Sequence, residues 1–288
     1  MGAAVQWIDI VQMGILGLMV GSFLNVVIHR LPLMMERQWA EECAELNGKS
    51  ADTSPAVPFN LMVPRSRCPH CGHQIAWYEN IPVVSYLLLR GKCSACKAGI
   101  NARYPAVELT TALLFAVAGS LHGTTWLGLA WAAFCALLIA LFLIDFDTQL
   151  LPDDLNYILL WLGLVVAALG WNVPLKSAVW GAVLGYLSLW SVFQVHHLLT
   201  GRVGMGHGDF KLLAALGAWF GAEHLIAIIL LSSLVGSVLG SIFLVVGRLA
   251  NKDIPFAFGP FLAGAGLLLF VVGPQTLAQW VPFAFPFG

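Results

Sequence analysis

Charged residues are scarce in this chain. Asp, Glu, Lys and Arg make up 10% of its 288 residues, whereas an ordinary soluble domain has about 25%. The formal net charge is -1 and no long basic run is present, so nothing indicates a nucleic-acid partner. Hydrophobic residues reach 59% and the mean hydropathy is +0.83. This composition excludes an ordinary soluble domain and predicts an all-α polytopic membrane protein.

Two further signals are missing. The first apolar stretch, 8–28, has no small-residue cleavage site and is longer than a signal-peptide core, so we expect a retained helix. No Gly-x-Gly-x-x-Gly follows a strand pattern in the polar region 31–104, which is also too short for a doubly wound cofactor domain. A conventional nucleotide-binding domain is therefore excluded there.

Windows of about 20 apolar residues predict about eight transmembrane helices. They lie near 8–28, 105–122, 125–144, 155–171, 175–199, 208–222, 225–247 and 257–280. The shortest, 208–222, would measure about 22 Å, but Arg202 and Arg248 both favour the inner side, which requires two crossings between them. We therefore expect a first transmembrane helix (1–30), a loop (31–104) and a seven-helix membrane domain (105–288).

The distribution of basic residues predicts the orientation. Residues 30–104 hold nine of the fourteen Lys and Arg, which places this loop in the cytoplasm. The loops 145–154, 199–207 and 248–256 then fall on the same side, and only Lys176 lies outside. On this topology Asp145 and Asp209 reach the same cytoplasmic face.

Four of the six cysteines form two Cys-x-x-Cys knuckles separated by 21 residues: Cys68, Cys71, Cys93 and Cys96. This spacing is typical of a zinc ribbon, in which four thiolates complete a tetrahedral site. Disulfides are the alternative but are disfavoured in a reducing cytoplasm, and a redox role fits two knuckles less well. His70 and His73 are spare candidate ligands. We expect a Zn²⁺ site that folds the loop.

Asp145 follows an apolar run, and Asp209 lies in the first turn of the candidate helix 208–222, directly after Gly206-His207-Gly208. Carboxylates beside lipid are costly and survive mainly where they carry a function. If the two meet, repulsion keeps one protonated while the other activates water, as in aspartyl proteases. Asp147 is an alternative to Asp145, and the bland alternative is that the acids, Asp153 and Asp154 included, solvate loops and cap helices. Glu108 is a third costly carboxylate, for which a structural role is favoured.

Together these residues resemble the type IV prepilin peptidase family. The matching motifs run nearly end to end: Gly21-Ser22-Phe23-Leu24-Asn25 with His29-Arg30-Leu31-Pro32, both knuckles, Glu79-Asn80-Ile81-Pro82, Arg103-Tyr104-Pro105 with Glu108, Ile144-Asp145 through Leu151-Pro152-Asp153, Gly206-His207-Gly208-Asp209, and Pro255 with Phe258-Gly259-Pro260.

The resemblance implies that Asp145 and Asp209 are the catalytic pair of a membrane aspartyl protease. It implies removal of the basic leader of prepilins and pseudopilins after a Gly, at the cytoplasmic face of the bacterial inner membrane, in type IV pilus or type II secretion assembly. The four-cysteine loop further implies N-methylation of the new terminal residue with S-adenosylmethionine. No cofactor-binding residue is assigned.

Two rival interpretations remain from the residues. A proton- or ion-coupled transporter would also carry acids within the membrane, although no inverted repeat is evident and a zinc loop is not expected of one. A membrane scaffold with a zinc ribbon would need neither aspartate.

Overall fold

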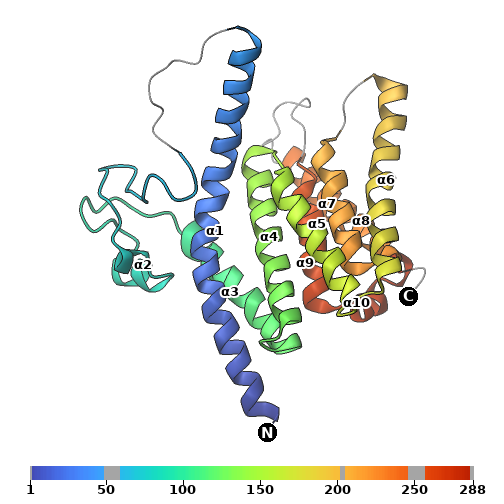
Figure 1. Ribbon diagram of the computed structural model, residues 1–288, viewed down its shortest axis with the longest axis horizontal. Coiled ribbons are helices and arrows are strands. Elements are labelled where there is room, and N and C mark those ends of the chain that lie inside the picture. The colour runs from blue at the N-terminus through green and yellow to red at the C-terminus, as the bar shows by residue number, and fades with distance from the viewer. Residues whose placement is uncertain (1, 49–58, 202–204, 246–256, 286–288) are drawn as a thin grey trace. The chain divides into compact units, whose positions relative to one another are not determined.

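The computed structural model describes residues 2–48, 59–201, 205–245 and 257–285, in two compact units, 1–128 and 129–288 (Figure 1). Within the described ranges the regular structure is helical, and β pairing is limited to the isolated bridges Arg67 with Gln74 and Lys92 with Gly99. The all-α class is therefore confirmed. The boundary between the two units lies after residue 128, whereas the expected membrane domain began at residue 105. Residues 105–128 group with the N-terminal unit.

The N-terminal unit is built on two antiparallel helices, α1 (Gly2–Leu46) and α3 (Arg103–His122). A Cβ atom added to Gly17 would lie 2.7 Å from the Cα atom of Ala112, and one added to Gly21 would lie 2.7 Å from that of Glu108. Only glycine permits this approach of two backbones. The short helices η1 (Trp77–Asn80) and α2 (Val84–Leu88) lie in the intervening loop.

Helix α1 continues beyond its expected end at residue 30. Its 45 residues would measure roughly 68 Å, about twice the hydrocarbon thickness of a bilayer. The extension to Leu46 is rich in Glu, Leu, Met and Ala, which are good helix formers. These residues are mostly exposed. The apolar window 8–28 therefore did not predict that the helix continues to Leu46.

The C-terminal unit takes in most of α4 (Trp126–Thr148) and the helices that follow. These are α5 (Asp153–Ala168), α6 (Leu175–Thr200), α7 (His207–Phe220), α8 (Leu225–Val245), α9 (Gly259–Val272) and α10 (Pro274–Trp280), with single turns η2 (Ala222–His224) and η3 (Pro282–Ala284). Helix α7 contacts α5, α6, α8 and α9, and all of its residues from Asp209 to Phe220 except Lys211 are buried. Protein rather than lipid therefore surrounds α7, which explains how so short a helix is accommodated.

Each of the eight predicted segments falls on a helix, but fewer qualify as full spans. Five helices in the described residues are long and apolar enough to cross a membrane, or six if α9 and α10, bent by 103°, form one span. The remaining two, α5 and α7, have 16 and 14 residues. Arg248 and Lys252, used to predict the topology, lie outside the described residues, as does Arg202.

Glycine also brings α6 and α7 together. A Cβ atom on Gly181 would collide with the carbonyl oxygen of Gly217, and one on Gly185 would lie 2.7 Å from the carbonyl oxygen of Leu213. The two helices therefore pack backbone against backbone at Gly181 and Gly185. Gly236 meets only the ring of Phe261, at an ordinary contact distance of 3.5 Å.

Candidate functional site

An aromatic cluster holds together the three helices that carry the candidate site. Trp131 and Phe134 of α4 contact Trp219 of α7 with ring centroids 4.7 and 4.8 Å apart, and Trp131 stacks on Phe270 of α9 at 4.9 Å. The indole N–H of Trp219 donates to the carbonyl oxygen of Leu159, at 2.9 Å. Large buried rings with a satisfied polar group fix these helices firmly.

The two aspartates lie at the other end of these helices. Asp145 is fourteen residues after Trp131 on α4, and Asp209 is ten residues before Trp219 on α7. Helix α4 runs from the aromatic cluster toward Asp145, and α7 runs from Asp209 toward the cluster. Both acids therefore lie at the opposite end of these helices from the aromatic rings. Gly259 opens α9 at the same end, eleven residues before Phe270. The packing of the aromatic end thus determines what meets at the acidic end.

Both carboxyl groups are buried and incompletely hydrogen-bonded. Asp145 is 4% exposed and Asp209 6%. Among the described residues, the fully buried side-chain oxygen and nitrogen atoms without a hydrogen-bond partner are Asp145 Oδ2, Asp209 Oδ1 and the amide atoms of Asn156. The negative charge of Asp145 acts on Asp209. Buried polar atoms normally have partners, so two acids that lack them and repel each other are a functional-site candidate.

Gly208, Gly259 and Leu151 lie close to the two aspartates. A Cβ atom on Gly259 would collide with Asp145 Oδ2 and lie 2.9 Å from Leu151 Cδ1, and one on Gly208 would lie 2.6 Å from Leu151 Cβ. Leu151 therefore packs against both glycines. Sequence reasoning gave no role to Gly259 or Leu151; the only signal for Gly259 was its place in Phe258-Gly259-Pro260.

The neighbouring acids have different surroundings. Asp147, Asp153 and Asp154 are all exposed. Asp153 accepts hydrogen bonds from Lys211 Nζ at both carboxylate oxygens, each 2.6 Å long. Lys211 is thus held by an ion pair at the start of α5, an arrangement that its sequence position did not predict. Of the four candidate acids on the α4–α5 segment, only Asp145 is buried.

The four knuckle cysteines lie together in the N-terminal unit. One sulfur from each of Cys68, Cys71, Cys93 and Cys96 lies within 4.8 Å of the others, and the sulfurs of Cys68 and Cys96 are 3.8 Å apart. All six cysteines of the chain are free thiols, which removes the disulfide alternative. A tetrahedral metal with bonds of about 2.3 Å to sulfur would separate its ligands by about 3.8 Å. The four thiols fit such a metal.

The two knuckles share one backbone design. The N–H of Cys68 donates to the carbonyl of His73, and that of Cys93 to the carbonyl of Ala98. The fourth residue after the first cysteine is left-handed in both, with φ of 73° at Gly72 and 62° at Lys97. Backbone N–H groups of Cys71 and His70 lower the pKa of Cys68 to about 7, which favours the thiolate form that binds metal.

His73, a spare candidate ligand, and Glu108, the carboxylate within α3, both contact other residues of the N-terminal unit. His73 lies 3.2 Å from Glu79. Hydrogen bonds from Ser94 and the N–H of Ala76, together with His73, hold the pKa of Glu79 at about 2, so it is ionised at neutral pH. Glu108 accepts a 2.7 Å hydrogen bond from the N–H of Val83. This hydrogen bond gives Glu108 a structural contact with the loop.

Comparison with known protein families agrees with the division of the chain into the units 1–128 and 129–288. The model of the Bacterial Peptidase A24 N-terminal domain matches residues 15–121, and that of the Type IV leader peptidase family matches residues 132–241. The chain belongs to the type IV leader peptidase family. The second match contains Asp145 and Asp209, and the first contains the four-cysteine loop. The family predicted from the residues is thus confirmed.

Relatives in this family are close over nearly their whole length. Three carry the name Prepilin leader peptidase/N-methyltransferase. The protein of Stutzerimonas stutzeri is 52% identical over 94% of this chain and 93% of its own length. That of Pseudomonas aeruginosa is 53% identical over 94% and 92%, and that of Aeromonas hydrophila 48% over 95% and 94%. No solved structure matches the chain significantly. No finding favours the transporter alternative.

Proposed function

We propose that this protein removes the basic leader of type IV prepilins and pseudopilins and then N-methylates the residue that cleavage exposes. The observation that carries the peptidase part is a pair of buried, mutually repelling aspartates, Asp145 and Asp209, in the unit matched by the leader peptidase model. The methyltransferase part is supported by relatives about half identical over more than nine-tenths of the chain, whose names include that activity.

The acid pair supplies the chemistry of hydrolysis. One ionised aspartate takes a proton from water as the water attacks the scissile carbonyl, while the protonated partner donates to the carbonyl oxygen. The same proton-sharing pair then returns a proton to the leaving amine, and no acyl-enzyme forms. Asp145 Oδ2 and Asp209 Oδ1 have no hydrogen-bond partner among the described residues, so a water or peptide would supply one. The glycines at 206, 208 and 259 leave room for a substrate backbone.

The distribution of charge supports a reaction at the cytoplasmic face of the inner membrane. The segment 30–104 carries nine of the fourteen Lys and Arg of the chain, which favours a cytoplasmic position. Asp145 ends a membrane-spanning helix and Asp209 begins α7. A prepilin whose apolar helix lies in the bilayer and whose basic leader stays inside would present its scissile bond at this depth.

The cysteine cluster is proposed to hold Zn²⁺ as a structural metal. Four cysteines leave no open coordination position, which is typical of structural rather than catalytic sites. The metal would hold the two knuckles together in a loop that has few buried apolar residues of its own.

Methyl transfer completes the proposed reaction sequence. S-Adenosylmethionine would supply the methyl group and leave as S-adenosylhomocysteine, and the terminal nitrogen that gains the methyl group would lose a proton. The attacking amine must be neutral. Cleavage therefore comes first, because it creates the amine.

A reconstituted reaction tests the whole proposal. The purified chain in lipid nanodiscs is incubated with a prepilin, with and without S-adenosylmethionine, and the mature N-terminus is analysed by mass spectrometry. We expect loss of the leader in both reactions and a gain of one methyl group only with the methyl donor. An uncut prepilin would contradict the peptidase assignment, and a cut but unmethylated product would contradict the second activity alone.

A further inference from the structure

An exposed apolar surface lies on the loop between α1 and α3. Six large exposed side chains form it, and together they are called the loop patch: Trp77, Tyr78, Ile81, Val84, Leu87 and Leu88. Residues 84, 87 and 88 share one face of α2, because they are three and four positions apart on a helix. No charged residue occurs between Glu79 and Arg90. A contiguous apolar surface of this kind marks an interaction site.

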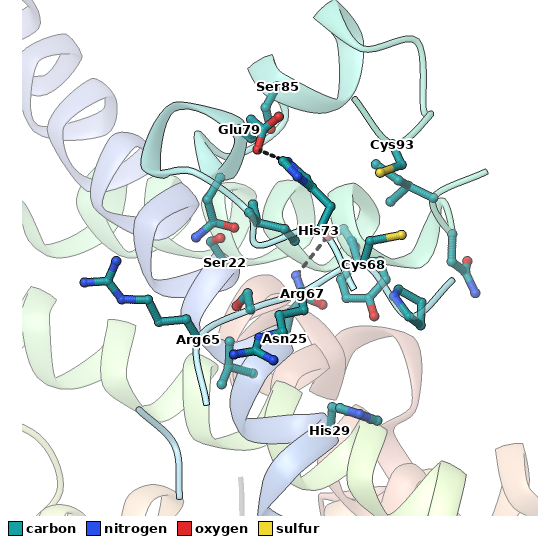
Figure 2. Close-up of a pocket in the computed structure, with 18 of the residues that line it drawn as sticks. Ser22, Asn25, His29, Arg65, Arg67, Cys68, His73, Glu79, Ser85 and Cys93 are labelled. Atoms are coloured by element: carbon teal, nitrogen blue, oxygen red, sulfur yellow. Dashed lines mark hydrogen bonds and ion pairs between the residues drawn. The ribbon is translucent and has the colours of Figure 1, made fainter. Parts of the chain in front are cut away.

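The other face of this segment is already occupied by protein. Ser85, Tyr86 and Leu89 line a cavity of about 780 Å³ within the N-terminal unit. Figure 2 shows Ser85 close to Glu79 on the wall of this cavity, with Glu79 joined to His73. Helix α2 is therefore amphipathic in its contacts: one face lines the cavity, and packing within the N-terminal unit leaves the loop patch uncovered.

One hydrogen bond fixes the position of this segment along α3. The backbone N–H of Val83, between η1 and α2, donates to the carboxylate of Glu108, at 2.7 Å. Val83 has φ of 60°, a conformation that a β-branched residue rarely adopts. Strain of this kind persists only where surrounding contacts enforce it. The segment is thus attached to α3 at this point.

Glu108 lies inside the candidate membrane span and not at its end. Helix α3 has 20 residues and is apolar enough to cross a membrane; it measures about 30 Å, the thickness of the hydrocarbon layer. Glu108 is five residues after Arg103, where α3 begins, and hence about 7 to 8 Å below the edge of that layer. Gly21, the residue of α1 that meets Glu108, is likewise seven residues before the end of the apolar run 8–28. Figure 1 shows α2 level with the middle of α1 rather than beyond its end.

The surface of α3 at this depth indicates which partner covers the loop patch. Leu109 follows Glu108 directly and is 53% exposed, and Leu113, one turn farther into the span, is 67% exposed. Exposed leucines on a membrane-crossing helix contact acyl chains, which are as apolar as they are. The loop patch continues this lipid-facing surface. A protein partner would have to displace lipid at a depth where the bilayer already supplies an apolar environment.

The residues at the two ends of the segment match a membrane interface. Trp77 and Tyr78 are the residue types enriched where acyl chains meet headgroups. Arg90 and Lys92 directly follow the loop patch and are exposed. Basic side chains next to apolar surface extend to the headgroup region, where anionic lipids attract them.

We propose that the loop patch is inserted into the leaflet on the loop's side of the membrane, where it contacts acyl chains and anchors the four-cysteine loop to the bilayer. The polar region 31–104 is then interrupted by a segment that enters the membrane without crossing it. Because Glu79 of η1 is bonded to His73 beside the first knuckle, the depth of the loop patch also sets the position of the cysteine cluster. The inference is independent of both proposed activities.

Photocrosslinking in a defined bilayer tests the insertion. The photoreactive amino acid p-benzoylphenylalanine replaces Leu87 or Leu88 in the full-length protein, which is reconstituted in phosphatidylcholine nanodiscs and irradiated. Mass spectrometry of the intact protein and of its peptides counts the lipid adducts. Two test positions are used so that one variant suffices if the other does not fold, and thermal unfolding shows which preparations are folded.

The chain offers a matched control on each side. Leu113, exposed on α3, is the positive control. Met62 is the negative control: it is apolar, 83% exposed and on the same loop. Its N–H donates to the side chain of Asn60, whose carbonyl accepts from Arg30, and Arg30 lies nine residues beyond Gly21 on α1. Met62 is thereby held outside the apolar part of α1.

We expect lipid adducts at positions 87 and 88 within about threefold of the yield at position 113 and at least about tenfold above that at position 62, because only inserted side chains meet acyl chains. Yields at both test positions no higher than at position 62 would overturn the insertion. Crosslinks to a second copy of the chain, or to an added prepilin in place of lipid, would overturn it as well, since a protein would then cover the loop patch.

Trp77 provides a second measurement that needs no photoreactive residue. The fluorescence that Trp77→Phe removes, taken as the difference from the native chain, should be quenched by lipids brominated near the headgroup and shielded from aqueous iodide. Difference fluorescence that iodide quenches and brominated lipid does not would place Trp77 in water and contradict the proposal.

Discussion

Asp145 Oδ2 occupies the space that a Cβ atom on Gly259 would fill, because the start of α9 lies directly against the end of α4. The carboxylate and Leu151 leave no room for even one methyl group at this position. We therefore predict that Gly259→Ala displaces the Asp145 carboxyl and lowers leader cleavage at least about tenfold, since misplacement by about 1 Å can cost a hundredfold. Initial rates on a prepilin substrate measure this.

Gly264 provides the matched control on the same helix. A Cβ atom there would meet nothing within 4 Å, so Gly264→Ala should cleave within about twofold of the native rate and should gain helix stability from the better propensity of alanine. Equal activity of the two alanine variants would show that the contact between Gly259 and Asp145 does not constrain the site.

The approach of α6 to α7 leads to a stability prediction. Because the backbones touch at Gly181 and Gly217, alanine at either position forces the helices apart. We expect Gly181→Ala and Gly217→Ala each to cost about 1–3 kcal/mol, the usual range for overpacking, and to lower the midpoint of thermal unfolding in detergent. Gly236→Ala, which faces only the ring of Phe261, should change that midpoint less. An unchanged midpoint for Gly181→Ala would contradict the packing described for α7.

Metal analysis provides a third prediction. The purified protein should contain one zinc ion per chain by elemental mass spectrometry. Cys68→Ser or Cys93→Ser should lose most of it, because both residues belong to the cluster of four thiols. Cys43→Ser is the control, since Cys43 is an exposed thiol on α1 outside that cluster. Full metal content in the two cluster variants, or a different metal throughout, would refute the zinc site.

Much of the helical framework follows from the sequence, because a membrane helix must bury its own backbone hydrogen bonds and hence appears as an apolar run. The glycines at 17, 21, 181 and 185 were also interpretable, since a small residue on such a helix usually marks a close contact. The knuckles were the most local pattern of all: two short turns that carry all four thiols. In each case the deciding physics lies within a few residues of the chain.

Other features depend on contacts that no local pattern reveals. The apolar runs do not show that α7 is covered by other helices while α6 has an exposed face, because the two sequences are about equally apolar. Gly259 was visible only as part of a short motif, since its role depends on a carboxyl group more than a hundred residues away.

Asp145 and Asp209 are proposed to act as one catalytic pair. Prepilin cleavage by single-substitution variants, measured side by side, is the sharpest test of this pairing. Asp145→Asn and Asp209→Asn are each compared with Asp154→Asn, an exposed acid in the first turn of α5, and with Asp147→Asn, the alternative to Asp145. Prepilin cleavage is followed in nanodiscs, with thermal unfolding and metal content as measures of folding.

If the two acids act as a pair, Asp145→Asn and Asp209→Asn should each lose leader cleavage by about a thousandfold or more while remaining folded. The variants of the exposed Asp147 and Asp154 should cleave at near-native rates, as this pairing requires. Cleavage at the native rate by either Asp145→Asn or Asp209→Asn would contradict it.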